Sequence, residues 1–514
     1  MSEAWKSHKN KRLFVGLGVT ATIALFVTSQ LLINDNVPLN WIHNRIKDVV
    51  QKDEPIDMFV ATAHAANFEH SPHLHTVYLN TMVGDTANSE EKRRDRMKFK
   101  CISDGDEVVD SLLHGIDGGG GCSWKNYYFV CQFQRPVQSV RLVDDSGFGP
   151  ELAVKQPISG KIPLVVCLSR TFYYENWQVM LTVLEMYKAM GVSEFSIHII
   201  NIVKEVYDIL KLYQNEINLK IHPGYLTPKI LGRPENPNFE TEAINQIVAY
   251  NDCFYSYREA AEFLIFSDLD DLITPENGDL LAKAQQLLQQ FPTASSFEFP
   301  WTISKFGGAQ NPSAFSIPRL FSGLEVLHIE NYGKSIIVPK RICNAIIHNA
   351  VGESARVKGY EHKNVSFTEG HGRTLHIREM VMKDFNGSVA DDKSVDKVDR
   401  KFVNIEAMER AERALRQRID GKLNKAFQTL PSNLFFTPLF RNCYKDMILD
   451  KRQCSSLSFC KITTENRPQC AAVASDYKGY INGKLNFYVQ HNLRIVEDSN
   501  CELQLANPVI IERR

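Results

Sequence analysis

From residue 160 onward, the sequence alternates between apolar strand patterns and helical patterns. Residues 162–168 have the composition of a buried strand, and residues 175–190 follow with large apolar side chains at helical spacing and Gly191 as the stop. This order predicts an α/β fold with a mainly parallel sheet, in which ligands bind beyond the carboxyl ends of the strands. The alternation continues as strand, helix, strand, helix and strand through residues 194–202, 204–213, 217–222, 241–259 and 262–267.

Two carboxylates stand where the last of these strands ends. Asp268 and Asp270 follow the apolar residues 263–266 and, if the chain is still extended, face the same side. Hard oxygen ligands of this kind suit Mn²⁺ or Mg²⁺ bridging a diphosphate. A solvated loop is the alternative, and the buried strand before the pair disfavours it. A phosphatase of the aspartyl-phosphate type also has Asp-x-Asp at a strand end, but Leu272 stands where that motif has Thr.

The regions outside this alternation have a different character. Residues 34–75 are polar and lack sustained periodicity, which fits a stem, and residues 76–158 carry short alternating segments that predict a small β-rich module. Residues 395–514 begin as a highly charged helical stretch and continue as a Cys-rich tail. The 59 Lys and Arg nearly balance the 60 Asp and Glu, so we expect no nucleic-acid partner.

An uncharged apolar run predicts a membrane anchor near the N-terminus. Residues 13–33 are long enough to cross a hydrocarbon core of about 30 Å as a helix. Basic residues precede the run and none follows it directly, which predicts a cytoplasmic tail at residues 1–12 and type II topology. A cleaved signal peptide is the alternative, but the run exceeds the usual apolar length of about 7 to 15 residues.

The cysteines indicate an oxidising compartment. All 11 follow the apolar run, and five fall between residues 443 and 501. This crowding predicts disulfides clustered within the tail, and the odd count leaves at least one free thiol. We expect Cys167, inside the first apolar strand, to be a buried core thiol rather than a nucleophile. Asn364 and Asn386 begin Asn-x-Ser sequons that are open to glycosylation in such a compartment.

Four segments taken together resemble glycosyltransferase family 92. They are VVCLSRTFYYENW (165–177), LEMYKAMGV (184–192), Q-x4-NDC (246–253) and FSDLDD (266–271). The resemblance implies a GT-A domain at residues 159–394, which is a single-lobed, Rossmann-like nucleotide-sugar transferase fold. It also implies a Golgi enzyme with a luminal catalytic part, and an inverting, metal-dependent β-galactosyltransferase activity that uses UDP-galactose.

The resemblance assigns the metal site residue by residue. Asp268 and Asp270 correspond to the motif that binds the metal and the diphosphate. A His-Tyr-Arg triplet of the family resembles His-Ile-Arg at residues 376–378, which implies that His376 completes the metal sphere although the middle residue departs from the pattern. His348, which follows a predicted strand, is the competing ligand. For both histidines, a hydrogen-bonded structural role is the alternative.

The resemblance also implies a nucleotide site. Ser169, Arg170 and Thr171, directly after the first strand, correspond to the residues that line the uridine and phosphate site, where Arg170 offers a charge-assisted contact. Lys334 and Arg319 are further candidates for contact with the diphosphate. A solvated basic residue is the alternative for both.

The catalytic base is the least determined part of the site. An inverting transferase needs a base that deprotonates the acceptor hydroxyl as it attacks the anomeric carbon. Glu298 is the candidate, because its flanking aromatic residues offer a stacking face for a sugar. An outward-facing residue on an alternating strand is the alternative. Asp271 departs from the Glu that relatives usually have at this position.

We therefore expect a Golgi type II glycosyltransferase that moves a hexose from a UDP-sugar to a hydroxyl of a glycan or glycoprotein, with galactose as the expected sugar. Bound Mn²⁺ or Mg²⁺ would neutralise the UDP leaving group. The alternative is a catalytically inactive, membrane-tethered glycan-binding protein on a degenerate transferase fold. A metal-dependent phosphohydrolase would need an aspartyl nucleophile and would transfer nothing to a sugar.

Overall fold

The computed structural model describes residues 55–67, 74–84, 97–116, 121–230, 236–348, 350–352, 362–385, 389, 393–449, 454, 456, 460, 462, 467–482, 485–503 and 506–513. From Ile56 onward, these residues belong to the same compact unit. The predicted cytoplasmic tail (1–12) and membrane anchor (13–33) lie outside the described residues. Within the described ranges, no helix is both long and apolar enough to cross a membrane.

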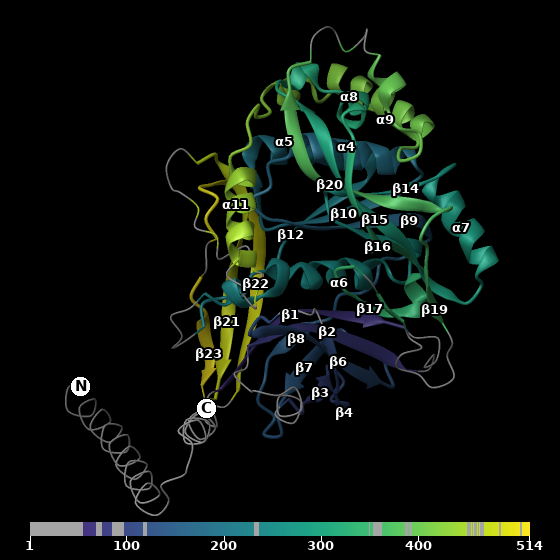
Figure 1. Ribbon diagram of the computed structural model, residues 1–514. Helices are drawn as coiled ribbons and strands as arrows, with labels where there is room; N and C mark the ends of the chain where they lie inside the picture. Colours follow the sequence, from purple (N-terminus) through teal and green to yellow (C-terminus); the bar gives the residue numbers. More distant parts are fainter. Residues whose placement is uncertain are drawn as a thin grey trace, which may run out of the picture. The chain divides into compact units, whose positions relative to one another are not determined.

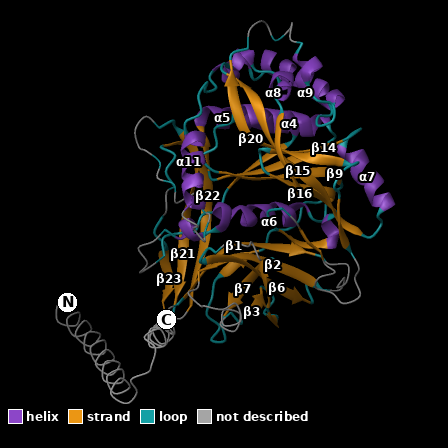
Figure 2. Ribbon diagram, in the orientation of Figure 1, coloured by secondary structure: helices purple, strands orange, loops and turns teal. Residues whose placement is uncertain are grey.

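A nine-stranded sheet carries the strands of the predicted alternation (Figures 1 and 2). Its first four strands in space, β12, β10, β9 and β13, run parallel, but β16 is antiparallel to β13 and to β15. The sheet is therefore mixed rather than mainly parallel, because residues 310–324, which include the short helix α8 (Ile317–Ser322), turn the chain back so that β16 runs antiparallel along β15. In spatial order the strands are β12 (Leu219–Pro223), β10 (Glu194–Ile199), β9 (Ile162–Thr171), β13 (Ala261–Ser267), β16 (Glu325–Ile337), β15 (Ala294–Ala309), β20 (Gly372–Lys383) and β14 (Asp271–Pro275), with β19 (Lys363–Ser366) paired to β15.

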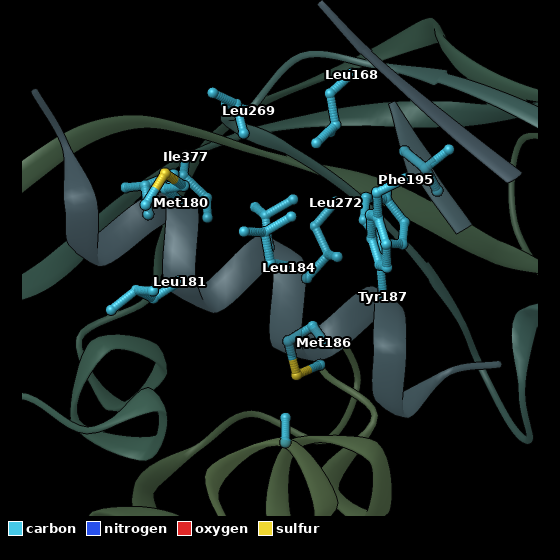
Figure 3. Close-up of a cluster of buried hydrophobic side chains, with 14 of the residues drawn as sticks. Leu168, Met180, Leu181, Leu184, Met186, Tyr187, Phe195, Leu269, Leu272 and Ile377 are labelled. Carbon is cyan, nitrogen blue, oxygen red and sulfur yellow. The ribbon is translucent and has the colours of Figure 1, made fainter. Parts of the chain in front are cut away.

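Helix α4 (Trp177–Ala189) lies in the core, close to the predicted range. Asn176 begins it, since its side chain accepts a hydrogen bond from the amide of Val179. The residues from Trp177 to Tyr187 are all buried. Figure 3 shows why: Leu184 points toward the sheet, whereas Met186 points away from it. A helix that is covered on every side packs against two layers, here the sheet and helix α9 (Ile405–Asp420).

The other helices lie on both sides of this sheet. Helix α6 lies between the nine-stranded sheet and the strands β1 and β2, while α4 and α9 lie on the opposite side (Figures 1 and 2). Both faces of the sheet are covered in this way, which fits the apolar strands that the sequence contains. The remaining helices are α5 (Lys204–Ile217), α6 (Gln246–Tyr257), α7 (Leu280–Gln290), α8 (Ile317–Ser322), α10 (Asn424–Gln428) and α11 (Phe436–Leu449).

A second sheet joins strands from the two ends of the described chain. Strand β1 pairs in parallel with β22, with Ile56 opposite Leu485. Residues 56–66, which the sequence suggests as part of a stem, thus form a strand inside a sheet. The eight strands are β11 (Asn201–Val203), β21 (Cys470–Ile481), β22 (Leu485–Ser499), β1 (Ile56–Ala66), β2 (His75–Gly84), β6 (Trp124–Phe133), β5 (Leu112–Ile116) and β23 (Val509–Arg513).

Two smaller sheets complete the described fold, and the four-stranded one lies in the region, residues 76–158, that the sequence predicts as β-rich. A four-stranded sheet lies within residues 100–153, and a two-stranded sheet within residues 342–352. Their strands are β4 (Val108–Asp110), β3 (Lys100–Ser103), β7 (Ser139–Val143) and β8 (Glu151–Ala153), and β17 (Ile342–Ala345) with β18 (Ala350–Gly352).

Ten of the cysteines form disulfides, and the buried Cys343 is the free thiol. The expectation of a free Cys167 was wrong, because α6 packs on β9 and brings Cys253 within 5.9 Å of it, measured between Cα atoms. Two of the bonds lie within the tail, as expected, and one links the tail to the N-terminal region. The pairs are Cys101–Cys131, Cys122–Cys454, Cys167–Cys253, Cys443–Cys460 and Cys470–Cys501.

The first predicted glycosylation sequon lies on strand β19. Asn364 is exposed, and its Oδ1 atom accepts hydrogen bonds from the hydroxyls of Ser295 and Ser296. A glycan would be attached to the Nδ2 atom, so it would leave both of these hydrogen bonds in place. Asn386, in the second sequon, lies outside the described residues.

Candidate active site

A pocket of about 430 Å³ opens where β9 and β13 end. Because these strands are parallel neighbours, their carboxyl ends meet at the same edge of the sheet. Strands β15 and β20 and helix α11 contribute further wall residues. The described residues that line the pocket are Ser169, Arg170, Phe172, Tyr174, Gln246, Asp268, Leu269, Asp270, Trp301, Ile347, His348, His376 and Tyr444.

Asp268 is held through both carboxylate oxygens. Gln246 Nε2 (2.5 Å) and the Tyr250 hydroxyl (3.1 Å), one turn apart on α6, donate to Oδ1, and Lys334 Nζ donates to Oδ2 at 2.8 Å. Burial acts to raise the pKa of Asp268, but the positive charges of Lys334 and Arg170 outweigh burial and lower the pKa well below its usual range. Asp268 is therefore a charged group whose oxygens are engaged by protein donors.

Lys334 is a buried cation beneath the pocket. Its side chain is 1% exposed, and Nζ lies 2.8 Å from Asp268, 3.4 Å from Asp271 and 3.1 Å from the carbonyl oxygen of Ile347. Burial acts to lower the pKa of Lys334, but the two carboxylates outweigh it and raise the pKa well above its ordinary value. The sequence suggests a diphosphate contact at this position, whereas the structure engages the ammonium with protein acceptors and leaves it out of the pocket wall.

Asp271 is fully buried and orients two rings of the pocket wall. Its Oδ1 atom accepts hydrogen bonds from Trp301 Nε1 and from His376 Nδ1, both at 2.8 Å. The antiparallel pairing of β14 with β20 places Asp271 directly opposite His376. Although burial acts to lower the pKa of His376, the carboxylates of Asp270 and Asp271 outweigh it and raise the pKa above its ordinary value.

Asp270 lines the pocket beside this pair. Its Oδ2 atom lies 3.9 Å from His376 Nδ1. Burial and the neighbouring carboxylates of Asp271 and Asp268 raise the pKa of Asp270 to about 6, against the opposing effect of His376. Among the three acidic residues of this segment, Asp270 is thus the carboxylate with the fewest protein donors and the strongest need for a further cation.

Three residues of this wall fit a divalent cation. Asp270, Asp271 and His376 offer ligand atoms that lie within 4.8 Å of one another. Two carboxylates and one imidazole are a ligand set that suits Mn²⁺. In addition, Asp271 Oδ2 is buried and makes no hydrogen bond among the described residues, although the ammonium of Lys334 lies 3.4 Å from it. Of the metal ligands predicted from the sequence, Asp270 and His376 belong to this cluster, whereas Asp268 pairs with Lys334 instead. Asp271 belongs to the cluster but was not predicted as a ligand.

The part of the wall that follows β9, next to Asp268, is basic and aromatic. Arg170 donates from Nη1 to the hydroxyl of Ser169 at 2.9 Å, while its Nε atom is buried without a partner in the described structure. Burial lowers the pKa of Arg170, against the opposing effect of Asp268. Phe172 and Tyr174 line the same side. A guanidinium with an unused donor beside aromatic rings suits a phosphorylated ligand with a planar base.

Besides Lys334, three predicted site residues do not line the pocket. Thr171 is buried at the end of β9. Arg319 is 3% exposed on α8, where Nη1 donates to the carbonyl oxygen of Ala314 at 2.9 Å. Glu298, the candidate base, is buried on β15 and accepts hydrogen bonds from the Gly333 amide and, at 2.6 Å, from a serine hydroxyl of β19. The geometry therefore gives these side chains structural contacts.

His348 lines the pocket but is not part of the cation cluster. Its ring centroid lies 5.4 Å from that of Trp301 and 5.7 Å from that of Tyr332. Burial and the charge of Lys334 lower the pKa of His348 to about 4, so the ring is neutral near pH 7. Its Nδ1 atom is buried without a partner among the described residues, as expected of a side chain that completes its hydrogen bonds with a ligand.

Several residues in and next to the pocket were not predicted as site residues from the sequence. Gln246, which lines the pocket, and Tyr250, which contacts Asp268 next to it, carried a signal, since residues four apart on a predicted helix share one face. Trp301 belongs to the aromatic stretch around Glu298. That stretch indicated a stacking face for a sugar, but the sequence does not show which of its rings lies in the pocket. For Tyr444, on α11, no local pattern connects the tail to the end of a strand more than 170 residues earlier.

Comparison with known proteins identifies the family of the chain. A mixed α/β fold with an acidic and basic pocket at the ends of parallel strands defines an enzyme that handles a charged ligand. The sequence profile of Glycosyltransferase family 92 matches residues 162–425, half of the chain. The chain belongs to glycosyltransferase family 92, which confirms the resemblance found in the sequence and makes glycosyl transfer its class of reaction.

Individual relatives are distant. One Caenorhabditis elegans protein of family 92 is 25% identical over 403 residues, covering 74% of this chain and 76% of that protein. Another from the same organism is 25% identical over 367 residues, covering 66% of this chain and 70% of that protein. Among solved structures, S. aureus TarS in complex with UDP aligns with 12% identity and a TM-score of 0.20, over 55% of this chain and 80% of that chain.

Proposed function

We propose that this glycosyltransferase moves galactose from UDP-galactose to a hydroxyl of a glycan, with inversion, on a GT-A domain at residues 159–394. The pocket at the ends of β9 and β13 is the observation that carries the proposal, because it gathers Arg170, Asp268 and Asp270. A guanidinium suits a diphosphate, and carboxylates suit a metal that binds the same diphosphate. Family membership supports a nucleotide-sugar donor and a glycan acceptor.

Asp270, Asp271 and His376 would hold Mn²⁺ or Mg²⁺. When bound, such an ion neutralises the charge that develops on a UDP leaving group. The chain itself fixes the ligands in advance: Asp271 orients the ring of His376, and Lys334 offsets the charges of Asp268 and Asp271. Preorganised ligands of this kind need little rearrangement when the donor binds.

The other wall residues bind and orient the donor. Arg170 directs its unused donor at the diphosphate, and Tyr174 offers a ring beside the uracil base. Trp301 and the neutral His348 lie on the side of the transferred sugar, where an indole face suits the apolar face of a hexose and the imidazole donates or accepts a hydrogen bond.

Luminal topology follows from the same proposal. A type II Golgi protein would expose Asn364 to the glycosylation machinery, and this residue lies on the surface of β19. We therefore expect the full chain, expressed in a eukaryotic cell, to lose apparent mass after endoglycosidase treatment. The Asn364→Gln variant should lose the part of that mass shift that comes from a glycan on Asn364. In sealed vesicles, the described residues of the chain should also be protected from added protease.

The activity is tested by UDP release from a panel of UDP-sugars, with Mn²⁺ or with a chelator, using the purified full chain. We expect release that depends on the metal, is confined to UDP-galactose and falls at least about 100-fold in Asp270→Asn. The matched control is Asp279→Asn, which removes a carboxylate that pairs with Arg410 outside the pocket. No release from any sugar in the presence of mixed glycan acceptors would overturn the proposal.

A glycan-binding protein without turnover is the second candidate. The observation that favours it is the engagement of Asp268 by Lys334, because that carboxylate already has a cationic partner. The two functions separate in the same assay. Calorimetric binding of UDP together with UDP release supports the transferase, while glycan binding with neither supports the second candidate.

A further inference from the structure

A second cavity lies next to the donor pocket. It has a volume of about 270 Å³, and Phe172 lines both cavities. Phe172 follows directly after β9, so it stands between the two cavities at the edge of the sheet that carries the donor site. A cavity of this size is small beside the range of about 300 to 1,000 Å³ that is usual for drug-sized ligands, and suits one sugar unit.

The backbone at this junction is held in an unusual conformation. Tyr173 has a φ of +45°, in the left-handed region that residues other than glycine rarely adopt. Its amide donates to Asn201 Oδ1 at 2.5 Å, and its ring lies 4.9 Å from that of Phe436 and 5.4 Å from that of Phe440. Outliers held in place by their surroundings cluster at ligand sites. Here the turn places Phe172 and Tyr173 together in the wall of the second cavity.

The polar part of the cavity wall includes Asn236 and a charge pair. The Arg467 side chain is 10% exposed, and Nη1 lies 3.4 Å from Oε1 of Glu502, whose side chain is 53% exposed. The same guanidinium donates from Nη2 to the carbonyl oxygen of Ile462 at 2.6 Å, which fixes its plane. The wall thus combines aromatic rings with hydrogen-bond donors and acceptors, and its net charge is balanced. This is the chemistry that recognises the hydroxyls and the apolar face of a neutral sugar.

The charge pair of this wall comes from outside the region that defines the family. The family profile ends at residue 425, whereas Arg467 and Glu502 lie beyond it. Two disulfides hold these segments: Cys443–Cys460 ends in the cavity wall, and Cys470–Cys501 lies next to Glu502. The residues that line the donor pocket come mainly from the family region. The second cavity, in contrast, takes several of its wall residues, including the charge pair, from the tail of this chain.

We propose that this second cavity is the acceptor subsite and holds a neutral sugar unit of the acceptor glycan. This inference rests on the proposed transferase function. Phe172 lines both cavities, so an acceptor sugar in the second cavity would lie beside the donor pocket, and its hydroxyl would reach the donor sugar past the edge of this ring. Because Arg467 is largely buried and already paired with the more exposed Glu502, the wall offers a carboxylate no free positive charge, so sialylated termini bind less well than neutral ones.

The test compares acceptor kinetics of the full chain with those of Arg467→Gln and Glu502→Gln. The acceptors are methyl glycosides of galactose, mannose, N-acetylglucosamine and sialic acid. We expect the acceptor KM to rise about tenfold in each variant. The KM for the UDP-sugar, and UDP release into water without any acceptor, should stay within about twofold. The matched control, Arg494→Gln, removes an exposed arginine of β22 that likewise donates to a backbone carbonyl and lines neither cavity.

The outcomes separate this inference from the transferase function. Loss of wild-type UDP release, with and without acceptors, means that the transferase function fails. If the wild type releases UDP but Glu502→Gln has the same acceptor KM as the wild type, the acceptor subsite alone is overturned. The same holds if the wild type releases UDP and prefers the glycoside of sialic acid as its acceptor. Circular dichroism and thermal midpoints of both variants show whether a raised KM comes from unfolding. If Arg467→Gln unfolds, the result for Glu502→Gln decides, because Glu502 is the exposed member of the pair.

Discussion

Among single residues, Lys334 explains how three acidic side chains share one strand end. Asp268, Asp270 and Asp271 would repel one another, and burial would add to the cost of their charges. The ammonium lies between Asp268 and Asp271 and offsets both. The Asp-x-Asp pattern is visible in the sequence, but its counter-ion lies more than 60 residues later on an antiparallel strand. Only the pairing of β13 with β16 brings the two together.

Removing this counter-ion should destabilise the protein strongly. Lys334→Met leaves the charges of Asp268 and Asp271 without their buried partner, so we expect the free energy of unfolding to fall by about 3 to 5 kcal/mol. Urea unfolding followed by fluorescence measures the change. Lys340→Met, at an exposed lysine six positions on, should change the same free energy by less than about 0.5 kcal/mol. Equal losses in the two variants would contradict a central role for Lys334.

The two carboxylates of the Asp-x-Asp motif should differ in metal binding. Asp268→Asn removes a side chain that already accepts from Gln246, Tyr250 and Lys334, so we expect Mn²⁺ affinity within about threefold of the wild type. Asp270→Asn removes a ligand beside His376 and should weaken Mn²⁺ binding by more than about tenfold. Electron paramagnetic resonance of free Mn²⁺ measures both affinities without any turnover. A greater loss in the Asp268 variant would assign the ion to that residue instead.

At the level of elements, local patterns predicted what is local and missed what depends on pairing. Strands β9 and β13 and helix α4 were predicted because each has an apolar pattern of its own and a clear stop. The contact of Asp271 with His376 was not, since it arises from the register of β14 against β20. Register depends on two segments at once, and a pattern read along one segment does not contain it.

Helix α11 depends on a carboxylate from the other end of the catalytic region. Glu175, after β9, accepts from the amides of Phe435 and Thr437 at 2.6 and 2.7 Å, at the start of the helix that carries Tyr444 into the pocket. We expect Glu175→Gln to lower the free energy of unfolding by about 1 to 2 kcal/mol and UDP affinity several-fold, because one oxygen and the charge are lost. Calorimetry and hydrogen exchange of α11 amides measure these effects.

A matched control for this prediction is available on another helix. Glu406→Gln changes an exposed glutamate in the first turn of α9, outside the pocket. It should leave UDP affinity and the exchange of α11 amides unchanged. If the Glu175 variant also leaves both unchanged, the link between the start of α11 and the donor pocket does not exist.

A buried histidine group joins β1, α6 and β10 and should make stability depend on pH. Asp252 accepts from His64 and from His198, both at 2.9 Å, and the ring of His222 stacks on His198 at 5.2 Å. Burial, with the neighbouring charge of His198, lowers the pKa of His222 to about 4. The unfolded chain binds this proton below about pH 6.5, but the folded chain does not. The stability that neutral His222 contributes to the folded state is therefore fully present above about pH 6.5 and is lost as the pH falls toward 4.

The change that tests this dependence is His222→Gln. It should make the decline in urea midpoint between pH 6.5 and 4 shallower than in the wild type, because one group that resists protonation in the folded state is gone. His328→Gln, at a histidine that is 60% exposed, should leave the decline as it is. A slope that is identical in all three proteins would contradict the assignment to His222.

At the level of the whole chain, segments that the sequence suggests as separate units are built into one another. Strand β1 from the expected stem pairs with β22 from the Cys-rich tail, across more than 400 residues of sequence. Helix α11 and the disulfide-held segments of the same tail complete the two cavities. A parallel pairing between distant segments has no local signature, so composition alone indicated only a boundary near residue 395.

The disulfide pattern gives the most direct test of this arrangement. In guanidinium without reductant, the full chain should react with one equivalent of maleimide, at Cys343, and with eleven after reduction. Peptide mass spectrometry should find Cys122 linked to Cys454, a bond that closes 332 residues. The double variant Cys122→Ser/Cys454→Ser should lose about 2 to 5 kcal/mol of unfolding free energy, because its unfolded chain is less constrained. Cys343→Ser should react with none and keep the wild-type midpoint, and three or more free thiols in the unreduced wild type would refute the pattern.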